Sequence, residues 1–412
     1  MPVNSGTISG PATIAVVGCG VIGLPTALLL ARAGYQVIGV DIDEHRLKQI
    51  NDWQLPYVGP SMRAVIADAG TRERLSAQKE MPAAEVYIIA APTPLKPGTR
   101  ECDLSAVITA TKAVAQRIQA GGLVILESTV PPQTCTSVIA PLLQEHGLVP
   151  GEAVHLAFCP ERVMPGRVYH ELIHNDRVIG GLTPACAEAA LAVYKSFVKG
   201  ELITTDCTTA ELCKLTENTF RDICIAFANE MSQVAEQLGV DQWELIKLAN
   251  LHPRVSIPWP GIGVGGHCLP IDPYFIVQAA PEHSSLIHAA RQINDRMPQV
   301  AFERIRTELA CVSQPKVVGF GVTYKPDTPD TRESPALVVW QLLRDAGFDL
   351  TVYDPLVAQY SYDSFAEAVE GADFVIVLVP HKEVLSQIRA HQELLAANGT
   401  QVLMLGHIQK TS

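Results

Sequence analysis

The sequence lacks the features that mark membrane, secreted and nucleic-acid-binding proteins. No apolar run in its 412 residues reaches the ~18 that a membrane span needs. The first eleven residues, MPVNSGTISGP, contain no positive n-region or apolar h-region, so we expect no signal peptide. The formal net charge of −12 argues against a nucleic-acid partner, which would require a basic surface. These absences predict a cytoplasmic protein that binds neither membranes nor nucleic acid.

Cysteine and histidine are present but lack the spacing of ligands. The ten cysteines form no CxxC pair, which argues against a disulfide framework or a zinc ribbon and suits a reducing compartment. The twelve histidines include no HExxH motif, so we expect no metal site. A hydrophobic content of 48% and a charged content of 18% describe an ordinary globular chain, and the length predicts two to three domains.

A glycine-rich turn near the N-terminus predicts a dinucleotide site. The apolar strand Ile14–Val17 leads into Gly18, Gly20 and Gly23 in G-x-G-x-x-G spacing, and a helix rich in Ala and Leu follows. Asp41 ends the next strand, 18 residues after Gly23 (41 − 23), close to the ~20 expected of a ribose-binding acid. Such a carboxylate repels a 2′-phosphate, so the pattern favours NAD over NADP. A βαβ unit without a cofactor is the alternative.

Two further strands, in VYIIAAPTP and LVILESTVPP, end in small polar residues. Because the carboxyl ends of parallel strands line the ligand crevice of an open sheet, we expect Thr93 and Thr129 to lie there. Either threonine could instead be a helix cap.

The last third of the sequence repeats the first third with an insertion. KVVGFGVTYK echoes IAVVGCGVIG, GFDLTVYDP echoes GYQVIGVDI, and ADFVIVLVPH echoes AEVYIIAAPT, which predicts a second Rossmann-like domain. In this alignment Gly319 matches Gly18, Tyr324 replaces the third glycine, and 12 extra residues contain the charged loop KPDTPDTRESPA. Lys325 and Arg332 in that loop are candidates for gripping a second anionic ligand. A merely solvated charged loop is the alternative.

The middle of the chain shows helical periodicity from about Thr208 to Ala249. Lys214 and Asn218 are four residues apart and share one helix face, near Arg221, although spacing alone also suits surface side chains. The loop GVGGHCLPID follows and places Cys268 among glycines that allow a ligand to approach.

A nicotinamide site, a second anion site and a thiol between them indicate a particular chemistry. NAD alone suffices to oxidise an alcohol to an aldehyde. Further oxidation to the acid is possible if a cysteine thiolate adds to the aldehyde, so that a second hydride can leave and a thioester remains. Cys268 is the candidate nucleophile, and Asp272 is placed to position or activate the hydrolytic water.

Five segments, GVGGHCLPIDPYF, STV, CPERVMPGR, AELCKLTENTF and YKPDTPDTRESPA, together resemble the UDP-glucose/GDP-mannose dehydrogenase family. The resemblance implies a four-electron oxidation of a UDP-sugar to its uronic acid with two NAD per turnover, and a homodimer formed through the central helices. It implies catalytic roles for Cys268 as nucleophile, Lys214 and Asn218 at the oxyanion, Asp272 and Thr129 at the water, and Glu161 in thioester hydrolysis. The expected cofactor contacts are Gly18, Gly20, Val21, Ile22, Gly23, Asp41, Arg46, Thr93, Thr129 and Arg332.

The segment CPERVMPGRVYHELIHNDRVIGG, with HPRV and GGHC, is most similar to the branch of the family that oxidises UDP-N-acetyl-D-mannosamine. By that resemblance Arg162, Arg254 and His267 are candidates for sugar recognition. Surface ion pairs for the two arginines and a loop hydrogen bond for the histidine are the alternatives. The full expected substrate set is Glu161, Arg162, Val163, Lys214, Asn218, Arg221, Arg254, His267, Tyr324 and Lys325.

We therefore expect an α/β protein with two Rossmann-like doubly wound parallel-sheet domains joined by a central helical domain. The expected boundaries are 1–205 for the NAD domain, 206–310 for the helical dimerisation domain with the cysteine loop, and 311–412 for the sugar-nucleotide domain. Alternative functions are a UDP-glucose or UDP-N-acetylglucosamine 6-dehydrogenase, a two-electron 3-hydroxyacid-type dehydrogenase, and a catalytically silent sugar-nucleotide sensor.

Overall fold

The computed structural model describes residues 12–56, 62–163 and 167–405. The N-terminal residues examined for a signal peptide lie outside these ranges. The chain divides into two compact units, Met1–Thr216 and Glu217–Ser412, which we call unit 1 and unit 2. Within the described ranges, no helix is both long enough and apolar enough for a bilayer crossing.

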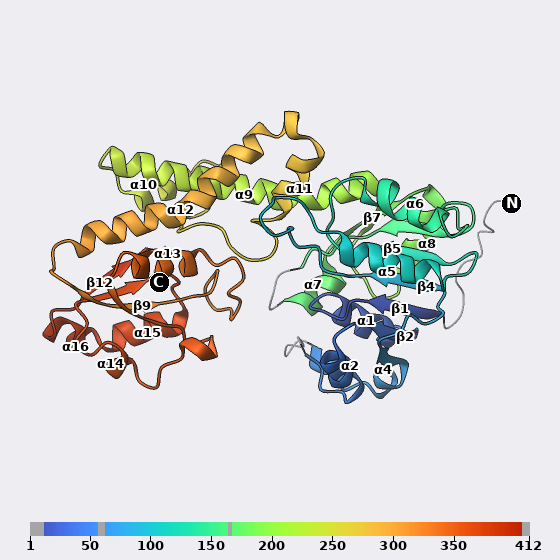
Figure 1. Ribbon diagram of the computed structural model, residues 1–412, viewed down its shortest axis with the longest axis horizontal. Coiled ribbons are helices and arrows are strands. Elements are labelled where there is room, and N and C mark those ends of the chain that lie inside the picture. Colours follow the sequence, from blue (N-terminus) through green and yellow to red (C-terminus); the bar gives the residue numbers. More distant parts are fainter. Residues whose placement is uncertain (1–11, 57–61, 164–166, 406–412) are drawn as a thin grey trace. The chain divides into compact units, whose positions relative to one another are not determined.

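Unit 1 is built on an eight-stranded sheet with the order β3-β2-β1-β4-β5-β6-β7-β8 (Figure 1). The strands are β1 (Thr13–Val17), β2 (Gln36–Val40), β3 (Leu75–Gln78), β4 (Val86–Ile89), β5 (Leu123–Leu126), β6 (His155–Phe158), β7 (Arg177–Gly181) and β8 (Leu202–Asp206). β4 and β5 are completely buried, as expected for parallel strands covered on both faces. The predicted doubly wound Rossmann-like sheet is confirmed.

The β6–β7 pairing departs from the parallel pattern, because these two strands are antiparallel. A parallel connection needs a crossover of a dozen or more residues, usually a helix. In the part of the connecting segment that the structure describes, the helix is the seven-residue α7 (Val168–His174), and the chain does not return to the opposite end of the sheet. The segment between β6 and β7 therefore begins and ends at the same end of the sheet, and it contains Glu161.

Two apolar layers cover the sheet of unit 1. On one face, Ile14, Val16 and their neighbours pack against α1 (Gly23–Arg32), α2 (Glu44–Asn51), α3 (Arg63–Ile66) and α8 (Pro184–Tyr194), near the short α4 (Ala69–Arg74). On the other face, Ala15, Val17 and their neighbours pack against α5 (Ser105–Ala115), the π-helix Cys135–Ile139, α6 (Ala140–Gln144) and the start of α9 (Cys207–Gln237).

The predicted helical region of the middle is present but interrupted. α9 ends at Gln237, and α10 (Gln242–Ala249) begins after a break in which Gly239 has a φ of +69°. Asp241 then caps α10 by accepting hydrogen bonds from the backbone N–H groups of Trp243 and Glu244. A left-handed glycine followed by an aspartate N-cap is the usual way to end one helix and begin the next.

Unit 2 contains the remainder of α9, the helices α10, α11 (Asp272–Ala279) and α12 (Ser285–Leu309), and a second sheet. The four parallel strands have the order β10-β9-β11-β12. They are β9 (Lys316–Phe320), β10 (Asp349–Tyr353), β11 (Phe374–Val377) and β12 (Gln401–Met404). One face packs on α12 and α13 (Pro335–Asp345), and the other packs on α14 (Phe365–Ala368), α15 (Lys382–Ala390) and α16 (Gln392–Ala397).

Strand register confirms two of the three repeat matches and corrects the third. Asp354 follows β10 as Asp41 follows β2, and His381 follows β11 as Thr93 follows β4. The counterpart of Gly18, however, is Gly321.

The two turn glycines share their conformation and their backbone bond. Gly321 has a φ of +97° and Gly18 a φ of +95°, and each donates its N–H to the last residue of the neighbouring strand, Tyr353 or Val40. The interval from Gly321 to Asp354 is 33 residues (354 − 321), against 23 from Gly18 to Asp41 (41 − 18), so the insertion has ten residues (33 − 23), not twelve. The position corresponding to Gly23 is Pro326, not Tyr324.

Gly319 lies inside β9 for a packing reason. A Cβ at this position would lie 2.5 Å from Cη2 of Trp340, whose ring is completely buried. The absence of a side chain at Gly319 makes room for the indole, and Trp340 Nε1 donates a hydrogen bond to the carbonyl oxygen of Gly321 (2.8 Å).

We predict that Gly319→Ala lowers the free energy of unfolding of unit 2 by about 1–3 kcal/mol, because the added methyl group overpacks the site against Trp340. Chemical denaturation followed by tryptophan fluorescence measures this change. Gly261→Ala is the matched control, since an added Cβ there meets no atom within 4 Å. Equal stability of the two variants would contradict this account of Gly319.

Candidate active site

The glycine turn of unit 1 has the geometry of a pyrophosphate cradle. A Cβ on Gly18 would lie 2.5 Å from the carbonyl oxygen of Ala90, and one on Gly23 would lie 1.8 Å from the carbonyl oxygen of Gly18. These two glycines therefore allow the tight turn and the close packing of α1 on β1. A Cβ on Gly20 would meet nothing within 4 Å, which leaves open space beside the backbone where a phosphate is expected.

Val21 and Ile22 complete the turn and lead directly into α1. Ile22 is the N-cap residue of α1, and no side chain caps the helix there. The N-terminal N–H groups of a helix carry a partial positive charge and favour an anion. The residues present therefore fit the pyrophosphate of a dinucleotide.

Asp41 lies at the end of β2, where a ribose-binding acid is expected. Its Oδ2 accepts hydrogen bonds from the Cys19 N–H (2.8 Å) and from Arg46 Nη1 (2.9 Å), and its Oδ1 accepts one from the Asp43 N–H (3.0 Å). Burial alone would raise the pKa of Asp41, but these donors outweigh it and hold the pKa below its ordinary value. Asp41 is therefore a carboxylate, and the structure brings Arg46 beside it.

Thr93 and Thr129 are brought together at the carboxyl ends of β4 and β5. Thr93 Oγ1 donates a hydrogen bond to the carbonyl oxygen of Thr129 (2.6 Å). Neighbouring Ser128 donates to the carbonyl oxygen of Ala91 (2.7 Å). These bonds connect the two strand ends that border the predicted crevice.

Glu161 and Lys214 form an ion pair within unit 1. Lys214 Nζ lies 3.5 Å from Glu161 Oε1, and the two side chains are only 7% and 13% exposed. Glu161 Oε2 also accepts a hydrogen bond from the Val163 N–H (2.8 Å). Arg162 turns away from this pair, because its Nη1 donates to the carbonyl oxygen of Asp176 (3.0 Å).

The sequence reasoning missed a buried ion pair behind these residues. Arg177 Nη1 lies 3.4 Å from Glu127 Oε1, and both side chains are almost completely buried. Glu127 Oε2 accepts a hydrogen bond from Thr26 of α1 (3.3 Å), and Arg177 Nη1 lies 3.7 Å from the sulfur of Cys159. The pair thus links α1 to the segments that carry Thr129 and Glu161. The available signal was a carboxylate at the end of the apolar run LVIL.

In unit 2 the cysteine loop leads directly into α11. The carbonyl oxygen of Cys268 accepts hydrogen bonds from the N–H groups of Ile271 (2.9 Å) and Asp272 (2.8 Å). Asn218 Nδ2 donates to Asp272 Oδ2 at 2.6 Å, and both side chains are buried. The structure therefore brings Asn218, Asp272 and the Cys268 backbone together.

The charged loop that follows β9 packs on the glycines of the cysteine loop. A Cβ on Gly265 would lie 2.5 Å from the carbonyl oxygen of Glu333, and one on Gly266 would lie 3.0 Å from Cε2 of Tyr324. The Gly266 N–H donates to the carbonyl oxygen of Arg332 (3.0 Å). The glycines of GVGGHC are thus required by the close approach of another segment of unit 2.

The pKa values of Arg332 and Tyr324 depend in part on the charge of Cys268 in the cysteine loop. Arg332 donates from Nε and Nη2 to the carboxylate of Asp330 (2.6–3.2 Å). That hydrogen bond raises the pKa of Arg332, and a thiolate at Cys268 acts in the same direction. Burial, followed by the charges of Asp330 and Cys268, raises the pKa of Tyr324.

The remaining predicted substrate residues lie nearer the surface of unit 2. Arg221, Arg254 and His267 are exposed, and His267 Nδ1 lies 4.0 Å from Asp330 Oδ2. Lys325 Nζ lies 5.5 Å from the centre of the Tyr324 ring. Arg332 belongs to unit 2, whereas the other expected NAD contacts belong to unit 1, so its cofactor role stays a prediction.

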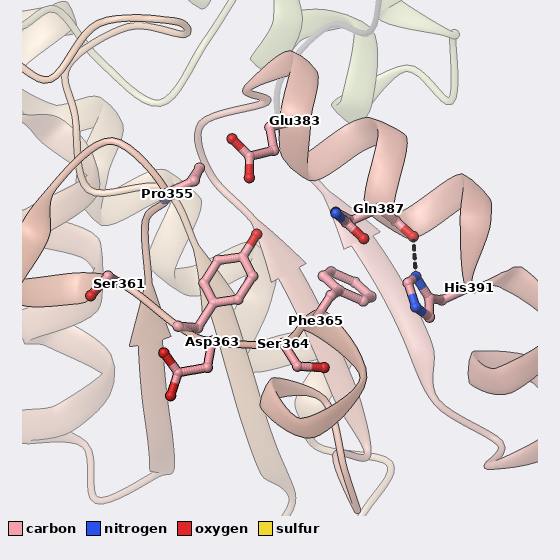
Figure 2. Close-up of a pocket in the computed structure, with 9 residues that line it drawn as sticks. Pro355, Ser361, Asp363, Ser364, Phe365, Glu383, Gln387 and His391 are labelled. Atoms are coloured by element: carbon pink, nitrogen blue, oxygen red, sulfur yellow. Dashed lines mark hydrogen bonds between the residues drawn. The ribbon is translucent and has the colours of Figure 1, made fainter.

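A separate hollow of about 370 Å³ lies in unit 2 between the segment after β10 and α15 (Figure 2). Among the described residues that line it are two carboxylates and no lysine or arginine. These residues are Pro355, Ser361, Tyr362, Asp363, Ser364, Phe365, Glu383, Gln387 and His391. No residue predicted from the sequence lines it. Its carboxylates would repel a diphosphate, so this hollow does not suit a nucleotide.

The fold and the glycine turn define a Rossmann-type dinucleotide-binding protein. Three family models match the chain in order: the UDP-glucose/GDP-mannose dehydrogenase NAD binding domain at residues 12–198, the central domain at 208–296 and the UDP binding domain at 319–403. The chain belongs to the UDP-glucose/GDP-mannose dehydrogenase family, and it is an NAD-dependent enzyme.

Individual relatives are similar over almost the whole chain. A UDP-N-acetyl-D-mannosamine dehydrogenase of Methanococcus maripaludis is 41% identical over 375 residues, which are 89% of this chain and 86% of the relative. An NDP-N-acetyl-D-galactosaminuronic acid dehydrogenase of Ralstonia solanacearum is 41% identical over 90% of this chain and 91% of its own. The structure of UDP-D-ManNAc dehydrogenase from Pyrococcus horikoshii is 40% identical with a TM-score of 0.89, covering 97% of this chain and 96% of that one.

We predict that Asp41→Ala weakens NAD binding by about tenfold or more, since hydrogen bonds to a charged group contribute about 1.5–3 kcal/mol. The same change should narrow the preference for NAD over NADP, because it removes a charge that repels a 2′-phosphate and leaves Arg46 to accept one. Fluorescence titrations with NADH and NADPH measure both effects. Asp52→Asn, at the exposed C-cap of α2, is the control. An unchanged ratio of NAD to NADP affinity in Asp41→Ala would contradict a role for Asp41 in ribose binding.

Proposed function

We propose that the protein oxidises the C6 hydroxyl of a UDP-N-acetylhexosamine, with UDP-N-acetyl-D-mannosamine as the favoured substrate, to the uronic acid in a four-electron reaction. The observation that carries this proposal is Cys268 in the glycine-rich loop, beside the buried Asn218–Asp272 hydrogen bond. The family membership and the names of the relatives support the substrate class. A substrate of the N-acetylgalactosamine series is the second candidate, favoured by the Ralstonia relative.

The proposed chemistry proceeds through a covalent bond to Cys268. NAD, when bound, would supply the hydride acceptor, and two NAD molecules per turnover are needed for the two hydrides that the sugar loses. The Cys268 thiolate adds to the aldehyde carbon, and the oxyanion that results takes up a proton as a thiohemiacetal forms. Loss of the second hydride, together with the proton of the thiohemiacetal hydroxyl, leaves a thioester. Water then adds to the thioester carbonyl, the carbon–sulfur bond breaks, and the thiolate and the acid are released.

The other catalytic roles are proposed for polar residues whose chemistry suits them. Lys214 and Asn218 are proposed to stabilise the oxyanion, as an ammonium and an amide N–H group can. Asp272 and Thr129 are proposed to hold the water, and Glu161 to promote hydrolysis. The ion pair with Lys214 keeps Glu161 in place, and the bond from Asn218 fixes Asp272.

Sugar-nucleotide recognition is proposed for Glu161, Arg162, Val163, Arg221, Arg254, His267, Tyr324 and Lys325, in addition to Lys214 and Asn218. The cations in this set supply the positive charge that a diphosphate requires. The segments 1–205, 206–310 and 311–412 are proposed as the NAD, helical and sugar-nucleotide domains. The absence of a disulfide among the ten cysteines, all of which are described, suits the proposed cytoplasmic location.

A homodimer is proposed through α9. Phe220, Phe227, Val234 and Leu238 are 66%, 48%, 40% and 70% exposed, respectively. Their spacing of seven, seven and four residues places them on one face of the helix. An apolar stripe of this kind is typical of a surface that another helix covers, and a second copy of α9 would present the same stripe.

The yield of NADH per sugar nucleotide at completion tests the proposed function. UDP-N-acetylmannosamine, UDP-N-acetylgalactosamine, UDP-N-acetylglucosamine and UDP-glucose are offered separately. Two NADH per sugar with one of them would establish the four-electron reaction and identify the substrate. One NADH per sugar would contradict a thioester step, and no turnover with bound NAD would support a silent sensor.

We predict that Cys268→Ala lowers formation of the acid by about a thousandfold or more, because removing a catalytic nucleophile has an effect of at least that size. NAD affinity should remain unchanged, since the glycine turn lies in unit 1. Product analysis by mass spectrometry and NADH titration measure the two quantities. Cys224→Ala, a change of a half-buried thiol on α9, is the control. Normal acid production by Cys268→Ala would contradict the proposed covalent mechanism.

We predict that Phe227→Asp raises the dissociation constant of the dimer by roughly 1,000-fold, because each of the two protomers loses about 2 kcal/mol of aromatic burial and places a charge in the interface. Sedimentation equilibrium over a concentration series measures this constant. Val338→Asp on α13 is the matched control, since Val338 is 49% exposed and Phe227 is 48% exposed. Equal dissociation constants for the two variants would place the interface elsewhere.

A further inference from the structure

A buried histidine occupies the place in unit 2 that Thr93 occupies in unit 1. His381 follows β11, is 1% exposed, and lies with Nε2 at 3.0 Å from Asp354 Oδ2. Asp354 is completely buried and also accepts hydrogen bonds from the N–H groups of Val322 and Leu356. The second Rossmann-like sheet thus keeps the carboxylate that corresponds to Asp41, but its oxygens are engaged inside the protein.

The second nitrogen of the His381 ring fixes the tautomer and reaches a different segment. Nδ1 accepts a hydrogen bond from the backbone N–H of Asp327 at 3.0 Å. Because a backbone N–H can only donate, Nδ1 is unprotonated and the ring proton is on Nε2, which donates to Asp354. One ring therefore joins the end of β10 to residues 322–333, the loop that contains the ten-residue insertion and that we call the inserted loop. Thr323 Oγ1 of this loop also lies 3.3 Å from Nε2.

A second connection holds the same loop to the start of α15. Asp327 Oδ1 accepts a hydrogen bond from the Lys382 N–H at 3.0 Å, and its Oδ2 lies 3.3 Å from Lys382 Nζ. Asp327 has a φ of +57°, a conformation that aspartate and asparagine tolerate better than other side chains. Inside the loop, Thr323 Oγ1 donates to the carbonyl oxygen of Lys325 (3.0 Å).

The loop held in this way is the one that packs on the cysteine loop. The Tyr324 N–H donates to the carbonyl oxygen of Asp330 (3.0 Å), and the Gly266 N–H donates to the carbonyl oxygen of Arg332 (3.0 Å). The ring of Tyr324 covers Gly266. A continuous set of contacts within unit 2 therefore runs from His381 through the inserted loop to the residue two before Cys268.

We propose that His381 is a positioning residue for sugar-nucleotide binding: its Nδ1 holds the loop that carries Tyr324, Lys325 and Arg332, while its Nε2–H anchors the ring to Asp354. The inference rests on the proposed function, because it assigns the loop to the sugar nucleotide. It also accounts for the difference between Asp354 and Asp41, because the oxygens of Asp354 are not available to bind the ribose of a dinucleotide. The carboxylate that would bind a ribose instead anchors the histidine.

Two substitutions of His381 test the hydrogen bonds of the two ring nitrogens separately. In His381→Asn the amide oxygen reaches the place of Nδ1 and can accept from the Asp327 N–H, whereas in His381→Gln the longer amide reaches the place of Nε2 and can donate to Asp354. We expect His381→Gln to weaken UDP binding about five- to tenfold, the effect of one lost hydrogen bond. His381→Asn should stay within about twofold of the wild-type chain. Calorimetric titration of the full chain with UDP, without NAD, measures both.

Controls distinguish positioning from general destabilisation. NAD binding should be unchanged in both variants, and Thr400→Val, which removes a buried hydrogen bond to the carbonyl oxygen of Ala372 in the same sheet, should lower stability without affecting UDP. Equal effects of the Asn and Gln variants on UDP binding would overturn the inference. If neither histidine variant folds, the exposed Asp327, whose side chain makes the second connection of the same loop to α15, tests whether UDP binding requires the loop to be held. Asp327→Ala should then weaken UDP binding and Asp327→Asn should not, and equal affinities would overturn the inference.

The outcome for the wild-type chain separates this inference from the proposed function. A wild-type chain that does not bind UDP would overturn both. A wild-type chain that binds UDP, with histidine variants that bind it equally well, would overturn only the role of His381.

Discussion

The structure depends most on places where two backbones approach so closely that no Cβ fits between them. In unit 1, Gly23 approaches the carbonyl oxygen of Gly18, and this contact sets α1 against β1 with its N-terminus at the crevice. In unit 2, Gly265 approaches the carbonyl oxygen of Glu333, and this contact sets the cysteine loop against the inserted loop. In both cases the glycines do more than supply flexibility. They determine the separation of the segments that carry the functional groups.

The two Rossmann-like sheets place a carboxylate at corresponding positions but surround it with different partners. In each sheet a carboxylate after the second strand accepts the N–H of the residue that follows the turn glycine, Cys19 for Asp41 and Val322 for Asp354. Asp41 has Arg46 beside it at the carboxyl end of β2, whereas Asp354 is covered by His381. In unit 2, a protein side chain, His381, therefore occupies the position beside the carboxylate where a ribose is expected in unit 1. The first sheet keeps an opening for the cofactor, and the second supports a loop.

Much of this was predictable from the sequence, because the signals were local. The spacing of Gly18, Gly23 and Asp41 fixed a strand, a helix and an acid in one step, and the structure confirms the Rossmann-like fold. The alignment of Gly319 with Gly18 was wrong, since a glycine inside a strand and a glycine in a turn look the same in one sequence. The strand register, the backbone conformation and the packing of Trp340 distinguish them. The β6–β7 reversal and the bond from His381 to Asp327 depend on contacts between distant segments, which local patterns do not contain.

An acidic protein that binds an anionic substrate faces an electrostatic problem, and the ion pairs indicate how it is met. Arg46 pairs with Asp41, Lys214 with Glu161, and Arg332 with Asp330. Burying an unpaired charge is costly, whereas a charge that exchanges one partner for another avoids most of that cost. These three predicted ligand-binding cations are thus already held by carboxylates. Binding of a phosphate or a developing oxyanion then requires only local exchange of partners, so a net charge of −12 is compatible with recognition of a nucleotide sugar.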